Sequence, residues 1–287
     1  MHVSAINIYP IKSLKGISVR SAMVEQRGLS LDRRWMLTTP EGKFITQREF
    51  PKMATITVAV RSDGLLASNA DHGEMMVPLA QDGAARISVT VWQSVCDGLA
   101  YNSRVNEWFS DVLGTDCRLV YMPDNSLRSV NKRFNGGEDI VSFADGYPLM
   151  ILGEASLDDL NEKISENADN GIGMRLPMNR FRPNLVITGA PPFAEDSWKR
   201  IRIGDAVFRS TKPCERCVIT TVEQSLGEFD GKEPLATLAK YRMAKDVISD
   251  TLESLGVGPN AVLFGQNLIG ETSGTAINLG DPVTVIE

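Results

Sequence analysis

The feature that most constrains the fold is a run of short apolar segments across the N-terminal third of the chain. These segments are rich in β-branched and aromatic residues, and Gly, Pro, Asp or Asn residues separate them. They lie at 3–9, 20–25, 33–38, 44–46, 54–60, 65–67, 75–77 and 86–92. Strands that are short and evenly spaced are typical of a β-barrel or a β-sandwich. We therefore expect this part of the chain to be mainly β.

Helical spacing of apolar residues is limited to a few places. It is clearest over 103–113, where Asn102 or Ser103 could cap the helix. Ser156 and Asp159 have the spacing of a capping box for a second helix. Further strands are expected at 118–122, 185–188, 200–203, 206–210, 218–222, 264–269 and 277–286. The fold class predicted for the whole chain is mainly β with some α.

Composition is that of a soluble globular protein, with 43% hydrophobic and 23% charged residues in 287. The four cysteines are scattered and form no disulfide framework, which favours a reducing compartment. No apolar stretch approaches the ~18 residues that a membrane-spanning helix needs. Residues 1–6 lack the basic and apolar segments of an export signal. We expect a cytoplasmic protein with no membrane contact.

The charge is unevenly distributed. The net charge of −6 argues against a nucleic-acid partner. Residues 10–48 carry eight Lys or Arg against three Asp or Glu, and residues 175–217 carry nine against four. Each segment is therefore +5, and the rest of the chain is −16. Although scattered Lys and Arg are usually solvated, two basic segments in an acidic chain favour one site for a small anion.

The first basic segment contains a turn-like stretch, 10–16, in which Lys12 and Ser13 could offer an ammonium and a hydroxyl to a phosphate. It is not a P-loop, because the GxxxxGK[ST] spacing is absent. The predicted anion site therefore needs contributions from elsewhere in the chain.

Cys214 and Cys217 lie three residues apart inside the second basic segment. Neighbouring Lys212 and Arg216 favour the thiolate form, which could bind a metal, act as a nucleophile or form a redox pair. The other Cys and His residues are isolated, which disfavours a four-ligand zinc site. A thioredoxin-type pair would open a helix, whereas the β-branched residues 218–222 predict a strand. Spacing alone does not distinguish these uses from an incidental pair of half-buried thiols.

Eleven short motifs occur in the same order as in the MOSC proteins, and they span nearly the whole chain. The motifs are Ile8–Ser13, Asp32–Arg33, Thr46–Arg48, Ser142–Gly146, Glu154–Leu157, Phe181–Asn184, Glu195–Trp198, Ile203–Asp205, Cys214–Val222, Glu233–Leu235 and Phe264–Gln266. The chain thus resembles the MOSC family, and within it the mitochondrial amidoxime reducing component and its bacterial YcbX-type relatives.

The resemblance implies a MOSC N-terminal β-barrel domain over 1–122 and a MOSC β-barrel domain over 123–287. The polar, turn-rich residues 123–140 would be a linker or mobile loop. The resemblance also implies a molybdenum cofactor (molybdenum-molybdopterin) between the domains. This cofactor is an anion that carries a phosphate, which agrees with the two basic segments.

The resemblance assigns a role to individual residues. Cys217 matches the molybdenum ligand, and thiolate suits that metal. Asp145 matches an acidic residue beside the metal and is the candidate for a catalytic proton transfer. A packing or indirect role is expected for Cys214. Six residues match positions that hold the cofactor: Lys12, Ser13, Arg33, Arg48, Arg182 and Asn184.

The implied activity is the reduction of small N-hydroxylated substrates such as amidoximes, hydroxylamines and N-hydroxylated bases, with the oxygen leaving as water. The CxxxxCxxC motif of the ferredoxin domain found in some relatives is absent. We therefore expect a separate electron-donor protein: a reductase, a ferredoxin-like protein or a flavoprotein. Two alternatives stay open: a molybdenum cofactor carrier or sulfur-transfer module without reductase activity, and a binding module for another phosphorylated ligand.

Overall fold

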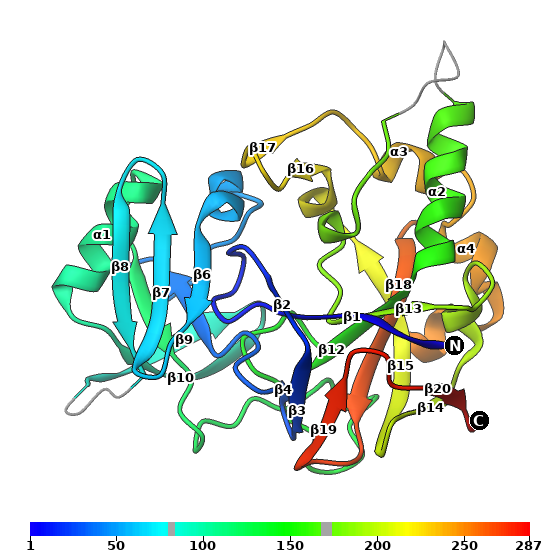
Figure 1. Cartoon of the computed structure of the whole chain (residues 1–287), viewed down its shortest axis with the longest axis horizontal. Helices are drawn as coiled ribbons and strands as arrows, with labels where there is room; N and C mark the ends of the chain where they lie inside the picture. The colour runs from blue at the N-terminus through cyan, green and yellow to red at the C-terminus, as the bar shows by residue number, and fades with distance from the viewer. Residues whose placement is uncertain (80–83, 168–173) are drawn as a thin grey trace.

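The computed structural model describes residues 1–79, 84–167 and 174–287. Figure 1 shows two groups of strands side by side: the group on the left comes from the N-terminal half of the chain, and the group on the right contains most of the C-terminal half together with the N-terminus itself. Short strands predominate and helices are few, so the predicted fold class, mainly β with some α, is confirmed. No helix in the described ranges is long and apolar enough to span a membrane.

The larger group is built around an eight-stranded sheet with the order β2-β1-β13-β12-β18-β15-β14-β20. We call this sheet and its surrounding helices the C-terminal lobe. The strands are β1 His2–Ile8, β2 Ile17–Val19, β12 Leu149–Gly153, β13 Leu185–Thr188, β14 Arg200–Ile203, β15 Ala206–Arg216, β18 Val262–Gly270 and β20 Val283–Val285. Its core includes Ile6, Ile151, Ile187, Phe208 and Leu268, which are fully buried.

The first strand of the chain belongs to this C-terminal sheet. In β1, Ile6 pairs antiparallel with Leu185 of β13. A small sheet, β19-β3-β4, likewise joins both ends of the sequence; its strands are β3 Ser21–Glu25, β4 Gly28–Leu29 and β19 Thr275–Asn278. The sheets are therefore not divided at residue 122, and the domain bounds given above stay a prediction.

The smaller group, which we call the N-terminal lobe, combines a four-stranded sheet, β5-β11-β10-β9, with a three-stranded sheet, β6-β7-β8. Its strands are β5 Trp35–Thr38, β6 Thr57–Val60, β7 Gly64–Asn69, β8 Gly73–Pro78, β9 Arg86–Val91, β10 Ser94–Ala100 and β11 Arg118–Tyr121. Helix α1, Ser103–Leu113, packs Phe109 against this core. The predicted cap is confirmed at Asn102, whose side-chain oxygen accepts a hydrogen bond from the Val105 N–H.

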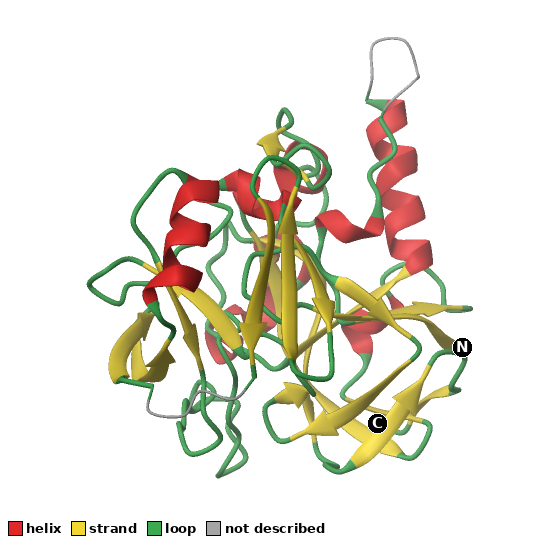
Figure 2. Ribbon diagram, turned by 60° about the vertical axis from the view of Figure 1, so that its left-hand side comes forward, coloured by secondary structure: helices red, strands yellow, loops and turns green. Residues whose placement is uncertain are grey.

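Most of the remaining elements lie around the C-terminal lobe, whereas the turn η1, Pro51–Thr55, packs Met53 into the core of the N-terminal lobe. The remaining elements are the helices α2 Glu154–Glu166, α3 Leu235–Leu238, α4 Ala244–Val247 and α5 Leu252–Leu255, the strands β16 Val222–Glu223 and β17 Glu228–Phe229, and the 3-10 turns η1 Pro51–Thr55, η2 Met178–Arg180, η3 Ala194–Ser197, η4 Val218–Thr221 and η5 Ser249–Thr251. The two longest helices of the described residues, α1 and α2, lie at opposite sides of the molecule (Figure 2).

The predicted strand over 218–222 is wrong. Residues Val218–Thr221 form the 3-10 turn η4, and only Val222 enters a strand. The Thr220 hydroxyl donates to the Cys217 carbonyl, and the Thr221 hydroxyl donates to the Val218 carbonyl. Such local bonds from Thr side chains compete with strand pairing, so β-propensity alone misled the prediction.

Three further expectations differ from the structure. The capping box is wrong, because the Ser156 hydroxyl is buried and donates to Glu195 Oε1 instead. Residues 44–46 form only an isolated bridge, Thr38 to Phe44, and 277–286 is split between β19 and β20. The strands β10 and β12 and the short strands β2, β4 and β17 were not predicted, and β15 continues beyond 210 to Arg216.

Residues 123–140 contain no helix or strand, as expected, but they are held by specific contacts. Arg128 is buried, and its guanidinium donates to the carbonyls of Ser142, Ala144 and Asp145. This stretch therefore fixes the backbone that carries Asp145.

We predict that Arg128→Met lowers the free energy of unfolding by about 3 kcal/mol, because the three carbonyls lose a charged donor. Urea unfolding measures this change. Arg118→Met is the matched control: Arg118 is exposed, so its loss should change stability by less than about 0.5 kcal/mol. Equal effects of the two substitutions would contradict the bracing role of Arg128.

Candidate functional site

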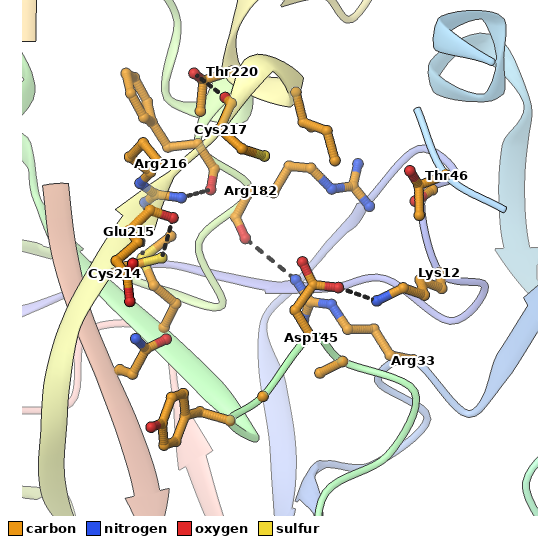
Figure 3. A pocket seen from close by; sticks show the side chains of 18 of the residues that line it. Lys12, Arg33, Thr46, Asp145, Arg182, Cys214, Glu215, Arg216, Cys217 and Thr220 are labelled. Atoms are coloured by element: carbon orange, nitrogen blue, oxygen red, sulfur yellow. Dashed lines mark hydrogen bonds and ion pairs between the residues drawn. The ribbon is translucent and has the colours of Figure 1, made fainter. Parts of the chain in front are cut away.

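A cavity of about 200 Å³ is lined by residues from both lobes. Figure 3 shows Lys12, Arg33 and Thr46 on one side, Cys214 and Cys217 on the other, and Asp145 between them. The structure brings together all eight residues that the resemblance singled out, and each lines this cavity: Lys12, Ser13, Arg33, Arg48, Asp145, Arg182, Asn184 and Cys217. Their individual roles stay predictions.

Backbone conformation sets several of these side chains. Ser13, Arg33 and Arg182 have φ values of 67°, 51° and 54°. A left-handed backbone is uncommon for residues other than glycine, and such residues gather at functional sites where the surrounding structure enforces them. Three left-handed residues around one cavity are consistent with a preorganised binding site.

A cluster of opposite charges crosses the cavity. The Lys12 ammonium is buried and donates to the Phe143 carbonyl at 2.8 Å and to the carboxylate of Asp145. Arg48 Nη2 lies 3.3 Å from Asp145 Oδ2 and 3.4 Å from Cys217 Sγ. The carboxylate of Asp145 therefore links Lys12 to Arg48, and Arg48 in turn reaches the sulfur of Cys217.

The cluster changes the pKa values of its members. Burial lowers the pKa of Lys12 to about 8, although Asp145 opposes the change. For Asp145, burial raises the pKa, but the cations Lys12 and Arg48 outweigh it and hold the pKa well below its usual range. The Asp145 side chain is 51% exposed, so solvent screens part of this effect. At neutral pH Asp145 is a carboxylate, and the lowered pKa of Lys12 brings its titration closer to neutrality than is usual for a lysine.

A second set of cations stacks on Tyr9. The guanidinium carbons of Arg33 and Arg182 lie 4.5 Å and 4.2 Å from the Tyr9 ring centroid. Arg33 Nη1 also donates to Asn184 Oδ1 at 3.1 Å, while Asn184 Nδ2 donates to the Asn7 carbonyl. Asn184 is thus occupied by protein contacts and orients Arg33. Burial lowers the pKa of Arg182 to about 10, and its Nη2 is buried with no hydrogen-bond partner.

The two cysteines lie in different environments. Cys214 sits within β15, and burial raises the pKa of its thiol. Cys217 follows the end of β15 and precedes η4, and its sulfur accepts a hydrogen bond from Arg48. Within the described residues both are free thiols, and it is the Cys217 sulfur that lies within hydrogen-bond distance of a guanidinium, that of Arg48.

Arg180 is a cavity residue that the sequence did not single out. Its side chain is fully buried, and Nη2 donates to Glu223 and Asp230 at 2.7 Å and 2.8 Å. Its Nε and Nη1 have no partner. In the sequence, the only hint of a role for Arg180 is its position in the second basic segment. Surface arginines share that position, so the sequence does not distinguish Arg180 from them.

The donors around the cavity fit an anionic cofactor with a soft metal. Arg180 and Arg182 carry buried N–H groups without acceptors, and leaving such groups unpaired is costly. Phosphate oxygens are acceptors that satisfy guanidinium groups well. Together with a thiol suited to a soft metal ligand, these residues fit the molybdenum cofactor.

Comparison with known families identifies the family to which this fold belongs. The model of the MOSC N-terminal beta barrel domain matches residues 1–116, and that of the MOSC domain matches residues 138–284. The chain belongs to the MOSC family, and in it the MOSC N-terminal beta barrel domain precedes the MOSC domain.

Among its relatives, mitochondrial amidoxime-reducing component 1 of Mus musculus is 34% identical, over 99% of this chain and 82% of that protein. The Homo sapiens protein of the same name is 31% identical over the same shares. The molybdenum cofactor sulfurase of Oryza sativa subsp. japonica is 33% identical over 93% of this chain, which spans only 34% of the sulfurase.

We predict that cofactor-free protein binds sulfate about tenfold more weakly at pH 9 than at pH 7. The protonated form of Lys12 binds the anion, and with a pKa of about 8 it loses most of its charge across this range. Sulfate keeps its own charge between pH 7 and pH 9, so any change in affinity measured by calorimetric titration comes from a group of the protein.

Lys12→Met should weaken sulfate binding at pH 7 and remove most of this pH dependence. Lys15→Met, which removes an exposed lysine outside the cavity, should leave the dependence intact. An unchanged pH dependence in Lys12→Met would show that another group is responsible.

Proposed function

We propose that this protein is a molybdenum-cofactor-dependent reductase of N-hydroxylated compounds. The observation that carries the proposal is Cys217, whose sulfur lies at the shared cavity with Arg48 Nη2 3.4 Å away. A guanidinium beside the sulfur would offset the negative charge of a metal-bound thiolate. Similarity to the amidoxime-reducing components supports the substrate class.

Cys217 is the proposed molybdenum ligand, and six residues would hold the rest of the cofactor: Lys12, Ser13, Arg33, Arg48, Arg182 and Asn184. When bound, the cofactor supplies the two-electron chemistry that N–O reduction requires. The chain contributes binding, orientation and the control of protons.

Asp145 and Lys12 have different roles in the proposed proton transfer. Because the pKa of Asp145 is held low, this carboxylate is a poor acid at neutral pH, and its contacts orient Lys12 and Arg48. Lys12 Nζ, with a pKa of about 8, can hold a proton beside the cavity and release it. We therefore assign the proton-donor role to Lys12 and a positioning role to Asp145.

Electrons are proposed to come from a separate donor protein: a reductase, a ferredoxin-like protein or a flavoprotein. The relatives are named as components, which fits a reductase that receives electrons from another protein. The free thiols of the described residues support a cytoplasmic, reducing location.

The alternative is a cofactor carrier or sulfur-transfer module. Similarity to the rice molybdenum cofactor sulfurase favours it, although the chain spans only 34% of that protein. In this case the cavity would bind the cofactor, and Cys217 would accept sulfur without any reduction of substrate.

The test is to express the protein in a host that makes the cofactor and to measure molybdenum, pterin and benzamidoxime reduction with an artificial one-electron donor. Wild type should contain the cofactor and reduce benzamidoxime. Cys217→Ser should lower kcat/KM by about a hundredfold or more, since even outer-shell changes cost 10–100-fold at metal sites.

Cys96→Ser is the control, because Cys96 is buried in the N-terminal lobe and does not line the cavity. It should retain activity within about threefold of wild type, less than the cost of an outer-shell change. Bound cofactor without reduction would favour the carrier. Full activity in Cys217→Ser would contradict the assigned ligand.

A further inference from the structure

Trp92 has a backbone and surroundings that folding alone does not explain. It is the first residue of the loop between β9 and β10, where Val91 pairs with Ser94, and its φ is 55°. At this position of a tight hairpin a positive φ favours glycine, and it is an outlier for a bulky residue. The side chain is also 49% exposed, so burial in the core does not account for a tryptophan here.

The indole belongs to an aromatic pair that supports the cations of the cavity. Its ring centroid lies 5.1 Å from that of Phe44 and 4.7 Å from the guanidinium carbon of Arg48. The Phe44 ring in turn lies 5.6 Å from Lys12 Nζ. Each ring therefore contacts one of the two cations that bind Asp145.

The contact with Arg48 matters because of what that side chain reaches. A single nitrogen, Nη2, serves both Asp145 Oδ2 and Cys217 Sγ. The 3.3 Å distance to the carboxylate oxygen is long for a charge-assisted bond, so a small rotation of the guanidinium would lose one acceptor. Stacking on the ring of Trp92 limits such a rotation, because the planar guanidinium stays against the aromatic face.

We propose that Trp92 is a positioning residue that holds the Arg48 guanidinium between Cys217 and Asp145. The inference rests on the proposed function, in which Cys217 is the molybdenum ligand. With Trp92 in place, positive charge is fixed beside the ligand sulfur and the anionic cofactor. The unfavourable φ is retained because a side chain at this point of the hairpin reaches Arg48, as strained residues near functional sites often do.

A double-mutant cycle tests the proposal, with Trp92→Leu, Trp92→Phe, Arg48→Met and the double variants. The first readout is the rate at which the diluted holoprotein loses molybdenum. Trp92→Leu should raise this rate about tenfold, a typical cost of disturbing a group around a metal site. Trp92→Phe should stay within about threefold of wild type, because phenylalanine keeps an aromatic face.

In the Arg48→Met background, Trp92→Leu should cause no further change, because a residue that acts through Arg48 has nothing left to position. A purely structural role would instead give the same increase in both backgrounds. That additive result would overturn the proposal.

A second readout does not need the cofactor. Alkylation of Cys217 by iodoacetamide in cofactor-free protein, located by peptide mass spectrometry, reports the charge beside its sulfur. Trp92→Leu should change the alkylation rate of Cys217 in the wild-type background and should cause no further change in the Arg48→Met background. If wild type contains no molybdenum but this cycle is non-additive, the proposed function fails while the role of Trp92 stands; additive effects in the alkylation cycle would overturn the role of Trp92.

Discussion

The ion cluster centred on Asp145 is the interaction on which the site depends. Lys12 is buried, and a buried ammonium without a partner would be strongly destabilising. The carboxylate of Asp145 compensates this charge and also binds Arg48, which reaches Cys217. Because Arg128 fixes the backbone at Asp145, segments distant in sequence are held at one place before any ligand binds.

The sheet topology explains how this cluster is kept rigid. Strand β1 lies inside the eight-stranded sheet, so the loop that carries Lys12 and Ser13 starts from a strand that has a neighbour on each side. Strand β15 pairs with β18 as far as Arg216, which places Cys217 one residue beyond a paired segment. Sites held on such elements are more precise than sites on free loops.

Much of this could be predicted from the sequence. Residue pattern gave the β-rich fold and the helix at 103–113, and the family motifs identified eight residues that the structure gathers at one cavity. Local patterns could not show that β1 pairs with β13, because that pairing joins segments far apart in the chain. They also could not show that Arg180 is buried or that Trp92 stacks on Arg48, since both depend on tertiary packing.

The central claim is that the cavity holds a molybdenum cofactor bound through the sulfur of Cys217. X-ray absorption at the molybdenum edge of holoprotein carrying selenocysteine at position 217 tests it most directly, because selenium scatters differently from every other neighbour expected at the metal. The account predicts a molybdenum–selenium contribution that is absent from the unsubstituted protein. Bound molybdenum with no selenium neighbour would contradict it.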